Sequence, residues 1–131
     1  MALRTKIVKQ YCLQILLFTS LYGCKTENCE EATSRNSNLE LRIIVKEVNW
    51  NGNLLNLDGI SIENGKSISF NNGSDWYYAI GGKIQVGDTL IKKKGEPIMR
   101  LYRKGERWLF TYICEKDSQG NIIVRSKDVK F

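Results

Sequence analysis

Apolar and polar side chains alternate along the chain from residue 39 onward. Three apolar side chains share one face of an extended segment, namely Leu41, Ile43 and Val45. A period of two residues is typical of a β-strand that buries one face. Pairs of residues that tolerate turn conformations separate the successive apolar runs, and these pairs are Asn51-Gly52, Asp58-Gly59 and Asn64-Gly65. The first half of this region therefore predicts a series of short hairpins.

The second half of the region continues this pattern. It predicts further strands at 84–86, 89–93, 98–102, 107–114 and 122–124. Segment 107–114 is apolar on both faces, as expected of a strand in the middle of a sandwich or barrel. Residues 75–80 predict one short helical turn, capped by Ser74 or Asp75 and ended by Gly81-Gly82. The predicted fold of residues 39–131 is therefore all-β, a small sandwich or barrel of about seven or eight short strands.

The first 23 residues have a different pattern. Three basic residues, Arg4, Lys6 and Lys9, precede an apolar run at 11–22. A basic start followed by a short apolar core is typical of a secretion signal. The run is too short to remain as a membrane span, which takes about 20 apolar residues. We therefore expect residues 1–23 to be a signal peptide and the chain to be exported.

Residues 25–38 are polar and have no periodic apolar pattern. Such a composition favours flexible coil. We therefore expect segment 24–38 to be a flexible tether in front of the β domain. A coil of this length spans about 20 Å, at roughly 5–6 Å times the square root of the residue number.

The end of the predicted signal, Leu21-Tyr22-Gly23-Cys24, resembles the lipobox of bacterial lipoproteins. The resemblance implies that the Cys24 thiol receives a diacylglyceryl group, that the signal is cut in front of it, and that this lipid holds the protein to a membrane. The alternative is an ordinary soluble secretory protein that is cut near the same place.

The residues after Cys24 bear on the location. Lipoproteins that stay at an inner membrane often have aspartate at the next position, and this chain has Lys25. The acidic residues Glu27, Glu30 and Glu31 resemble the surface-export tags of some Bacteroidetes lipoproteins. We therefore expect a lipid-anchored protein of the outer membrane, either at the cell surface or on the periplasmic face.

Cys29 and Cys114 remain in the predicted mature chain in addition to Cys24, whereas Cys12 leaves with the signal. In an oxidising compartment they form the one pair that a disulfide could use. Alternatively, Cys29 is free on the tether and Cys114 is a small core residue. The alternation of Cys114 in phase with the aromatic residues of segment 107–114 favours this second alternative.

Composition argues against several kinds of chemistry. The chain of 131 residues has 20 basic residues, 14 acidic residues and no histidine, which gives a net charge of +6. Without histidine, Ser/His and Cys/His nucleophiles and histidine metal sites are excluded. The sequence has no phosphate-binding glycine loop and no nucleophile elbow. We therefore expect no enzymatic activity, no cofactor and no metal.

The positive charge is concentrated in one segment. Residues 92–107 contain seven basic and two acidic residues, a net charge of +5. The candidate anion-binding residues are Lys92, Lys93, Lys94, Arg100, Arg103, Lys104 and Arg107. An anionic polymer or lipid headgroups would fit such a segment, and nucleic acid fits less well because an exported protein meets little of it. The favoured alternative is a solvated sheet edge, where lysines block edge-to-edge aggregation.

Residues 86–98, VGDTLIKKKGEPI, are similar to the strand–turn–strand kernel of bacterial PDZ domains. The helix that a PDZ domain needs before its last strand is absent here. Together with residues 100–114, the stretch resembles a group of small uncharacterised Bacteroidetes lipoproteins over about residues 75–114, a group with no assigned activity. Read from the residues alone, Gly87 supplies a turn conformation and Asp88 caps backbone amides.

The aromatic run Trp76-Tyr77-Tyr78 could stack on sugars or peptides, but such runs more often pack their alternate members into a core. The overall expectation is a cell-envelope lipoprotein with a non-catalytic β domain in a binding or structural role. Its expected partners are the membrane, through the lipid on Cys24, and an envelope protein or anionic polymer. The alternative is a soluble secreted enzyme or inhibitor that acts on an envelope polymer.

Overall fold

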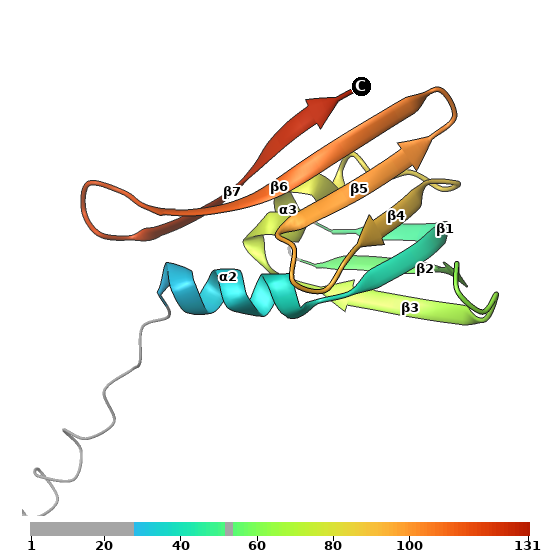
Figure 1. Cartoon of the computed structure of the whole chain (residues 1–131), viewed down its shortest axis with the longest axis horizontal. Helices are drawn as coiled ribbons and strands as arrows, with labels where there is room; N and C mark the ends of the chain where they lie inside the picture. The colour runs from blue at the N-terminus through green and yellow to red at the C-terminus, as the bar shows by residue number, and fades with distance from the viewer. Residues whose placement is uncertain (1–27, 52–53) are drawn as a thin grey trace, which may run out of the picture.

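The computed structural model describes residues 28–51 and 54–131 of the chain. The predicted signal peptide and the predicted lipidation site at Cys24 lie outside the described residues. Seven strands form one antiparallel sheet with the order β3-β2-β1-β4-β5-β6-β7, and the sheet is not closed (Figure 1). None of the helices in the described part is long and apolar enough to cross a membrane.

The sheet consists of two meanders joined by the pairing of β1 with β4. The seven strands are β1 (Leu41–Trp50), β2 (Leu55–Ser61), β3 (Ser67–Asn72), β4 (Thr89–Lys92), β5 (Ile98–Arg103), β6 (Glu106–Lys116) and β7 (Ile122–Lys130). Two helices accompany them, α2 (Cys29–Asn38) before β1 and α3 (Asp75–Gly81) between β3 and β4.

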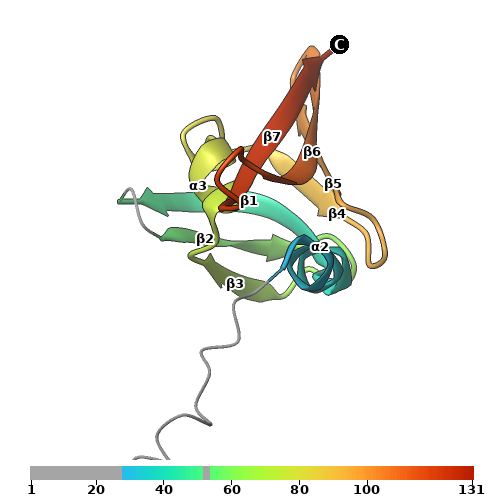
Figure 2. The same ribbon diagram turned by 90° about the vertical axis from the view of Figure 1, so that its left-hand side faces the viewer.

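The predicted mostly-β composition is confirmed, but the predicted sandwich or barrel is wrong. A single open sheet is present, and its edge strands β3 and β7 do not pair. Figure 2 shows how strongly the sheet turns between β1–β3 and β6–β7. Helix α3 supplies Trp76, Tyr77 and Ile80 to the core, so a helix, rather than a second sheet, completes the buried layer.

The core lies on one face of the sheet. The strand residues that point into it alternate with less buried ones, as the sequence predicts. The most deeply buried are Ile43, Val45, Leu55, Leu57, Leu90, Met99, Leu101 and Phe110. The opposite face of β6 carries Leu109 and Ile113, which are only half-buried. Segment 107–114 is apolar on both faces although β6 lies next to the edge strand β7.

Asp58-Gly59 does not form the predicted turn, because β2 runs through it. The paired strand β1 has an irregularity between Val45 and Glu47, and Gly59 pairs with Val45 at this position. A Cβ atom at Gly59 would lie 2.2 Å from the carbonyl oxygen of Ile44. The glycine is therefore needed for close approach of two strands and not for a reversal of the chain.

The predicted strand at 84–86 is also wrong, because these residues lead into a turn in front of β4. Gly87 has a φ of 95°, a backbone conformation that favours glycine. The Asp88 carboxylate accepts a hydrogen bond of 2.8 Å from the backbone amide of Gln85. The predicted capping function of Asp88 is thereby confirmed.

The predicted helical turn is confirmed as α3, with Ser74 at the N-cap position and Gly82 at the C-cap position, although the Ser74 side chain makes no capping hydrogen bond. Side chains link this helix to the edge strand β7. Trp76 Nε1 donates to Ser126 Oγ at 3.2 Å, and Ser126 Oγ donates to Asp128 Oδ1 at 2.5 Å. Lys83, just after α3, forms an ion pair with the same aspartate. Ser126 and Asp128 on the inner side of β7 therefore hold the helix in place.

Replacing Tyr77 by phenylalanine should raise the free energy of unfolding by about 1 kcal/mol, because the Tyr77 hydroxyl is buried without a hydrogen-bond partner. Burial also raises the pKa of the Tyr77 phenol. Since this pKa is higher in the folded state, stability should fall as the pH rises above about 10, the unfolded value. Tyr77→Phe should therefore lose less stability than the parent between pH 7 and about pH 11.

Urea unfolding at pH 7 and at about pH 11 measures both effects of the Tyr77 substitution. Tyr78→Phe is the matched control, because the Tyr78 side chain is 53% exposed. Identical unfolding curves for the parent and Tyr77→Phe at both pH values would contradict the prediction.

The segment predicted as a flexible tether contains helix α2, so the expectation of coil is wrong for residues 29–38. Asn28 caps the helix, because its side-chain oxygen accepts a hydrogen bond of 2.9 Å from the backbone amide of Glu31. Glu30 and Glu31 in the first turn and Arg35 in the last turn complement the helix dipole. These polar features support a helix without an apolar stripe.

Candidate functional site: a cleft under helix α2

A hollow lies between α2, the β3–α3 connection and the β6–β7 hairpin. It has a volume of about 560 Å³, within the range of small-molecule sites. We call it the α2 cleft. Helix α2 contributes Ala32, Arg35 and Asn36, and residues 72–75 run from the end of β3 to the start of α3. The strands β6 and β7 contribute Tyr112, Ile122 and Val124. Leu39, which follows α2, completes the lining.

Asn36 is the buried polar residue of this cleft. Its side chain is only 5% exposed, and its Oδ1 atom has no hydrogen-bond partner. A buried carbonyl oxygen that lacks a donor costs about 1–3 kcal/mol. An apolar residue at this position would avoid that cost.

The cleft has an apolar floor and a polar rim. The larger apolar side chains that line it are Leu39, Tyr112, Ile122 and Val124. Arg35 lies on α2 and Asp75 lies at the start of α3, so the two opposite charges come from different walls. A molecule that carries both an apolar body and polar groups fits such a surface.

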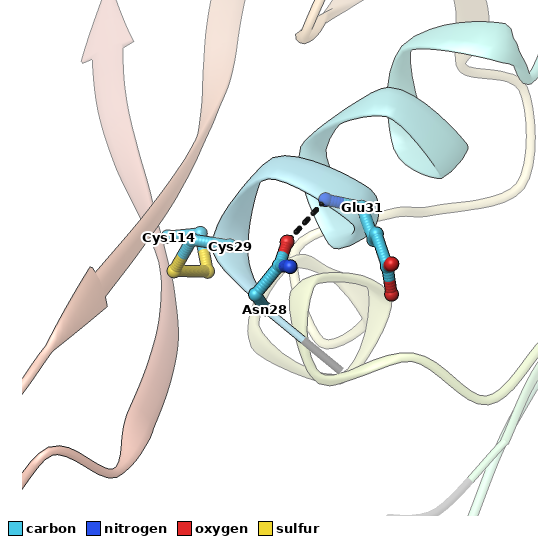
Figure 3. Close-up of a disulfide and its surroundings, with 4 residues drawn as sticks. All are labelled: Asn28, Cys29, Glu31 and Cys114. Carbon is cyan, nitrogen blue, oxygen red and sulfur yellow. Dashed lines mark hydrogen bonds between the residues drawn. A yellow bond between two sulfur atoms is a disulfide. The ribbon is translucent and has the colours of Figure 1, made fainter. Parts of the chain in front are cut away.

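A disulfide fixes the N-terminal end of α2 next to the cleft. Cys29 is bonded to Cys114 of β6, with a Cα–Cα distance of 5.5 Å. Figure 3 shows the bond beside the Asn28 cap at the first turn of the helix. Cys114 pairs across the sheet with the cleft residue Val124. Of the two alternatives for these cysteines, the structure therefore contains the disulfide, although Cys114 also packs against the core.

Lys92 fixes the C-terminal end of the same helix. Its side chain is fully buried, and its ammonium donates hydrogen bonds to the carbonyl oxygens of Leu39 at 2.9 Å, Glu96 at 2.8 Å and, more weakly, Ser37 at 3.5 Å. The last carbonyls of a helix have no partner within the helix. Burial lowers the pKa of the Lys92 ammonium, and the charge of Glu96 opposes this shift. Helix α2 is therefore held at both ends.

The burial of Lys92 removes it from the predicted anion-binding set. Two further members of that set are engaged with carboxylates. Arg100 forms an ion pair of 2.7 Å with Glu96, and this bond lowers the pKa of the Glu96 carboxyl. Arg103 donates to both oxygens of the Asp88 carboxylate at 2.8 Å. The seven cations therefore do not form one surface patch.

Four predicted anion-binding residues remain exposed, namely Lys93, Lys94, Lys104 and Arg107. Lys93 and Lys94 lie in the β4–β5 turn, and Lys104 lies in the β5–β6 turn. Arg107 lies in β6, where its guanidinium is 5.2 Å from the centre of the Phe131 ring. The sequence prediction of a basic surface segment holds only for these residues.

The aromatic run also divides between core and surface. Trp76 and Tyr77 are buried, whereas Tyr78 is exposed and its ring centre lies 5.7 Å from that of Trp50. The Trp50 side chain is 41% exposed. No metal-binding group of three or more Cys, Asp or Glu residues occurs among the described residues.

No protein-family model matches the chain, and no curated protein or solved structure matches it either. Functional conclusions therefore depend on the chain's own residues.

Sequence reasoning missed the α2 cleft because it assigned residues 25–38 to a tether. One signal was present in the sequence. Asn28 followed three residues later by Glu31 is a helix N-terminus pattern. The cysteine that follows Asn28 would then lie in the first turn, where a bond to Cys114 brings the helix to the sheet.

Proposed function

We propose that the chain is an exported bacterial lipoprotein, held at the cell envelope by lipid on Cys24, whose β domain has a non-catalytic binding role. The observation that carries this proposal is the Cys29–Cys114 disulfide, five residues after the lipobox-like cysteine. Disulfides persist in oxidising compartments outside the cytosol. The bond therefore supports the export that the basic and apolar N-terminal pattern predicts.

The start of α2 gives the anchor a short reach. The helix cap at Asn28 is four residues beyond Cys24, and four residues span at most about 14 Å. The coil predicted for residues 25–38 has fourteen residues and would hold the domain farther from the membrane. Lipid on Cys24 would accordingly hold the end of the domain that carries the disulfide close to the membrane surface.

The cleft supports the binding role. It lies in the part of the domain that the disulfide and Lys92 hold in place, and a pre-formed concave site lowers the cost of ordering a ligand. No described residue cluster favours the alternative of a secreted enzyme, because the charged side chains nearest the sheet core are occupied in structural pairs such as Arg103–Asp88.

Palmitate labelling in cells tests the anchor. The parent chain should incorporate the label, and Cys24→Ala should lose it completely, because the thiol is the point of lipid attachment. Cys12→Ala is the matched control and should keep the label, since Cys12 lies within the predicted signal. The mass of the recovered parent should correspond to a lipidated chain that starts at Cys24.

Three outcomes would overturn the anchor: labelling of Cys24→Ala at the parent's level, no label in the parent, or a recovered chain that still starts at Met1. Absence of label from a chain recovered outside the cell would instead favour the soluble secreted alternative.

A further inference from the structure

The α2 cleft combines three features that together define the chemistry of a ligand. It has an apolar floor, a lining residue, Asn36, whose buried side-chain oxygen has no partner, and opposite charges on two different walls. A site for a purely apolar molecule would need only the first of these features. A site for a simple anion or cation would need only one charge.

The apolar floor is suited to an aliphatic or aromatic side chain. Val124 and Ile122 project from the inner side of β7, and Tyr112 projects from the neighbouring strand β6. Tyr112 is 8% exposed, and its ring packs edge-on against buried Trp76. This floor therefore belongs to the rigid core.

The Asn36 carbonyl is an acceptor that lacks a donor. Buried hydrogen-bond donors and acceptors in proteins nearly always have a partner. Because Asn36 lines the cleft, a rotation of its side chain could bring this oxygen to a bound N–H group. A ligand with an ammonium or amide N–H would satisfy this oxygen.

The two charges on the rim come from separate elements. Arg35 on α2 offers a guanidinium, which matches a carboxylate. Asp75 at the start of α3 offers a carboxylate, which matches an ammonium. A molecule that carries both groups on one small frame could contact both walls at the same time.

We propose that the α2 cleft binds a zwitterionic amino compound with an apolar side chain, either a free amino acid or a short peptide. Its side chain lies on the Tyr112 floor, its ammonium faces Asp75 and Asn36, and its carboxylate faces Arg35. This inference rests on the binding role proposed above but not on the lipid anchor, because described residues alone form the cleft.

Calorimetry on the mature protein recovered from cells tests the ligand class. The probes are L-leucine, the dipeptide L-leucyl-L-leucine, and N-acetyl-L-leucinamide, which has the side chain but neither charge. At least one zwitterion should bind saturably and at least tenfold more tightly than the uncharged probe, a difference of about 1.4 kcal/mol. Whichever of the two zwitterions binds more tightly indicates whether the ligand is a free amino acid or a peptide.

Variants test whether the binding occurs in the cleft. Asn36→Leu should weaken binding of the better zwitterion at least tenfold while the urea midpoint stays equal or rises, because the unpaired carbonyl is removed. Asn38→Leu is the matched control, since Asn38 is exposed and does not line the cleft, and it should change affinity less than twofold. Arg35→Gln and Asp75→Asn should each weaken binding.

Three outcomes would overturn the inference: no saturable binding of either zwitterion up to about 10 mM, beyond the millimolar range of weak ligands; equal binding of the uncharged probe; or unchanged binding by Asn36→Leu. These outcomes are separate from the labelling result, which bears on the anchor alone.

Discussion

Replacing both Cys29 and Cys114 by serine should lower the free energy of unfolding by about 4–5 kcal/mol. The two cysteines are 85 residues apart, and in the chain-entropy model a cross-link of this span removes that much freedom from the unfolded chain. Urea unfolding followed by tryptophan fluorescence measures the difference. The loss is a large part of the 5–15 kcal/mol typical of a domain.

The single variant Cys29→Ser distinguishes loss of the bond from loss of local packing. It should cost about as much as the double variant, because either substitution removes the same cross-link. Reductant should shift the parent to the unfolding midpoint of the double variant and should leave the double variant unchanged. An unchanged midpoint of the parent after verified reduction would refute the prediction.

Arg103→Met should lower the free energy of unfolding by about 3 kcal/mol. The Asp88 side chain is 1% exposed, and Arg103 donates two hydrogen bonds of 2.8 Å to its carboxylate. Removing one partner of a buried ion pair leaves the other charge without compensation, which typically costs about 3–5 kcal/mol. About a quarter of the Arg103 side chain is exposed, so water weakens the pair and the expected loss lies at the lower end of this range.

Two further variants isolate this pair. Asp88→Asn in the Arg103→Met background should recover part of the lost stability, because it removes the uncompensated charge and keeps an oxygen for the Gln85 amide. Arg107→Met is the matched control, since Arg107 lies on the exposed side of β6, and surface changes of this kind stay within about 0.5 kcal/mol. Equal losses of unfolding free energy for Arg103→Met and Arg107→Met would show that the buried pair contributes no more to stability than an exposed arginine does.

Most of the strands could be predicted from the sequence, because the alternation of apolar and polar residues and the turn-forming residues between them indicate the same strand boundaries. The Asn64-Gly65 turn occurs as expected, with a positive φ of 69° at the glycine. The turn predicted at Asp58-Gly59 was wrong, because the sequence does not distinguish a glycine that allows close approach of two strands from one that allows a turn. Closure of the sheet depends on contacts between strands far apart in the chain, which periodicity does not report.

The helix α2 could not be recognised from apolar periodicity, because its residues are almost all polar. It is stabilised by its cap, the disulfide and the Lys92 ammonium, and the last two connect it to distant strands. The cleft depends on this helix and was therefore missed with it. Its ligand-facing residue Asn36 has no motif that sequence alone would single out.

The basic segment was misread because counting charges ignores which way side chains point. Lys92 follows Leu90 by two residues in β4, so alternation places it on the buried face. The same rule separates Arg103 from its exposed neighbour Tyr102. Applying the alternation of the strands to the charged residues as well as to the apolar ones would have identified both inward-facing cations.

The order of the two bonded cysteines along the chain has a consequence for biogenesis. If the chain is exported N-terminus first, as proposed, Cys29 would emerge early, and its partner would follow only after five strands and most of a sixth. An oxidase that acts in this interval would meet the neighbouring thiols of Cys24 and Cys29 before the thiol of Cys114. If Cys24 is already acylated, this mispairing is chemically blocked, so the lipid would protect disulfide fidelity as well as fasten the protein.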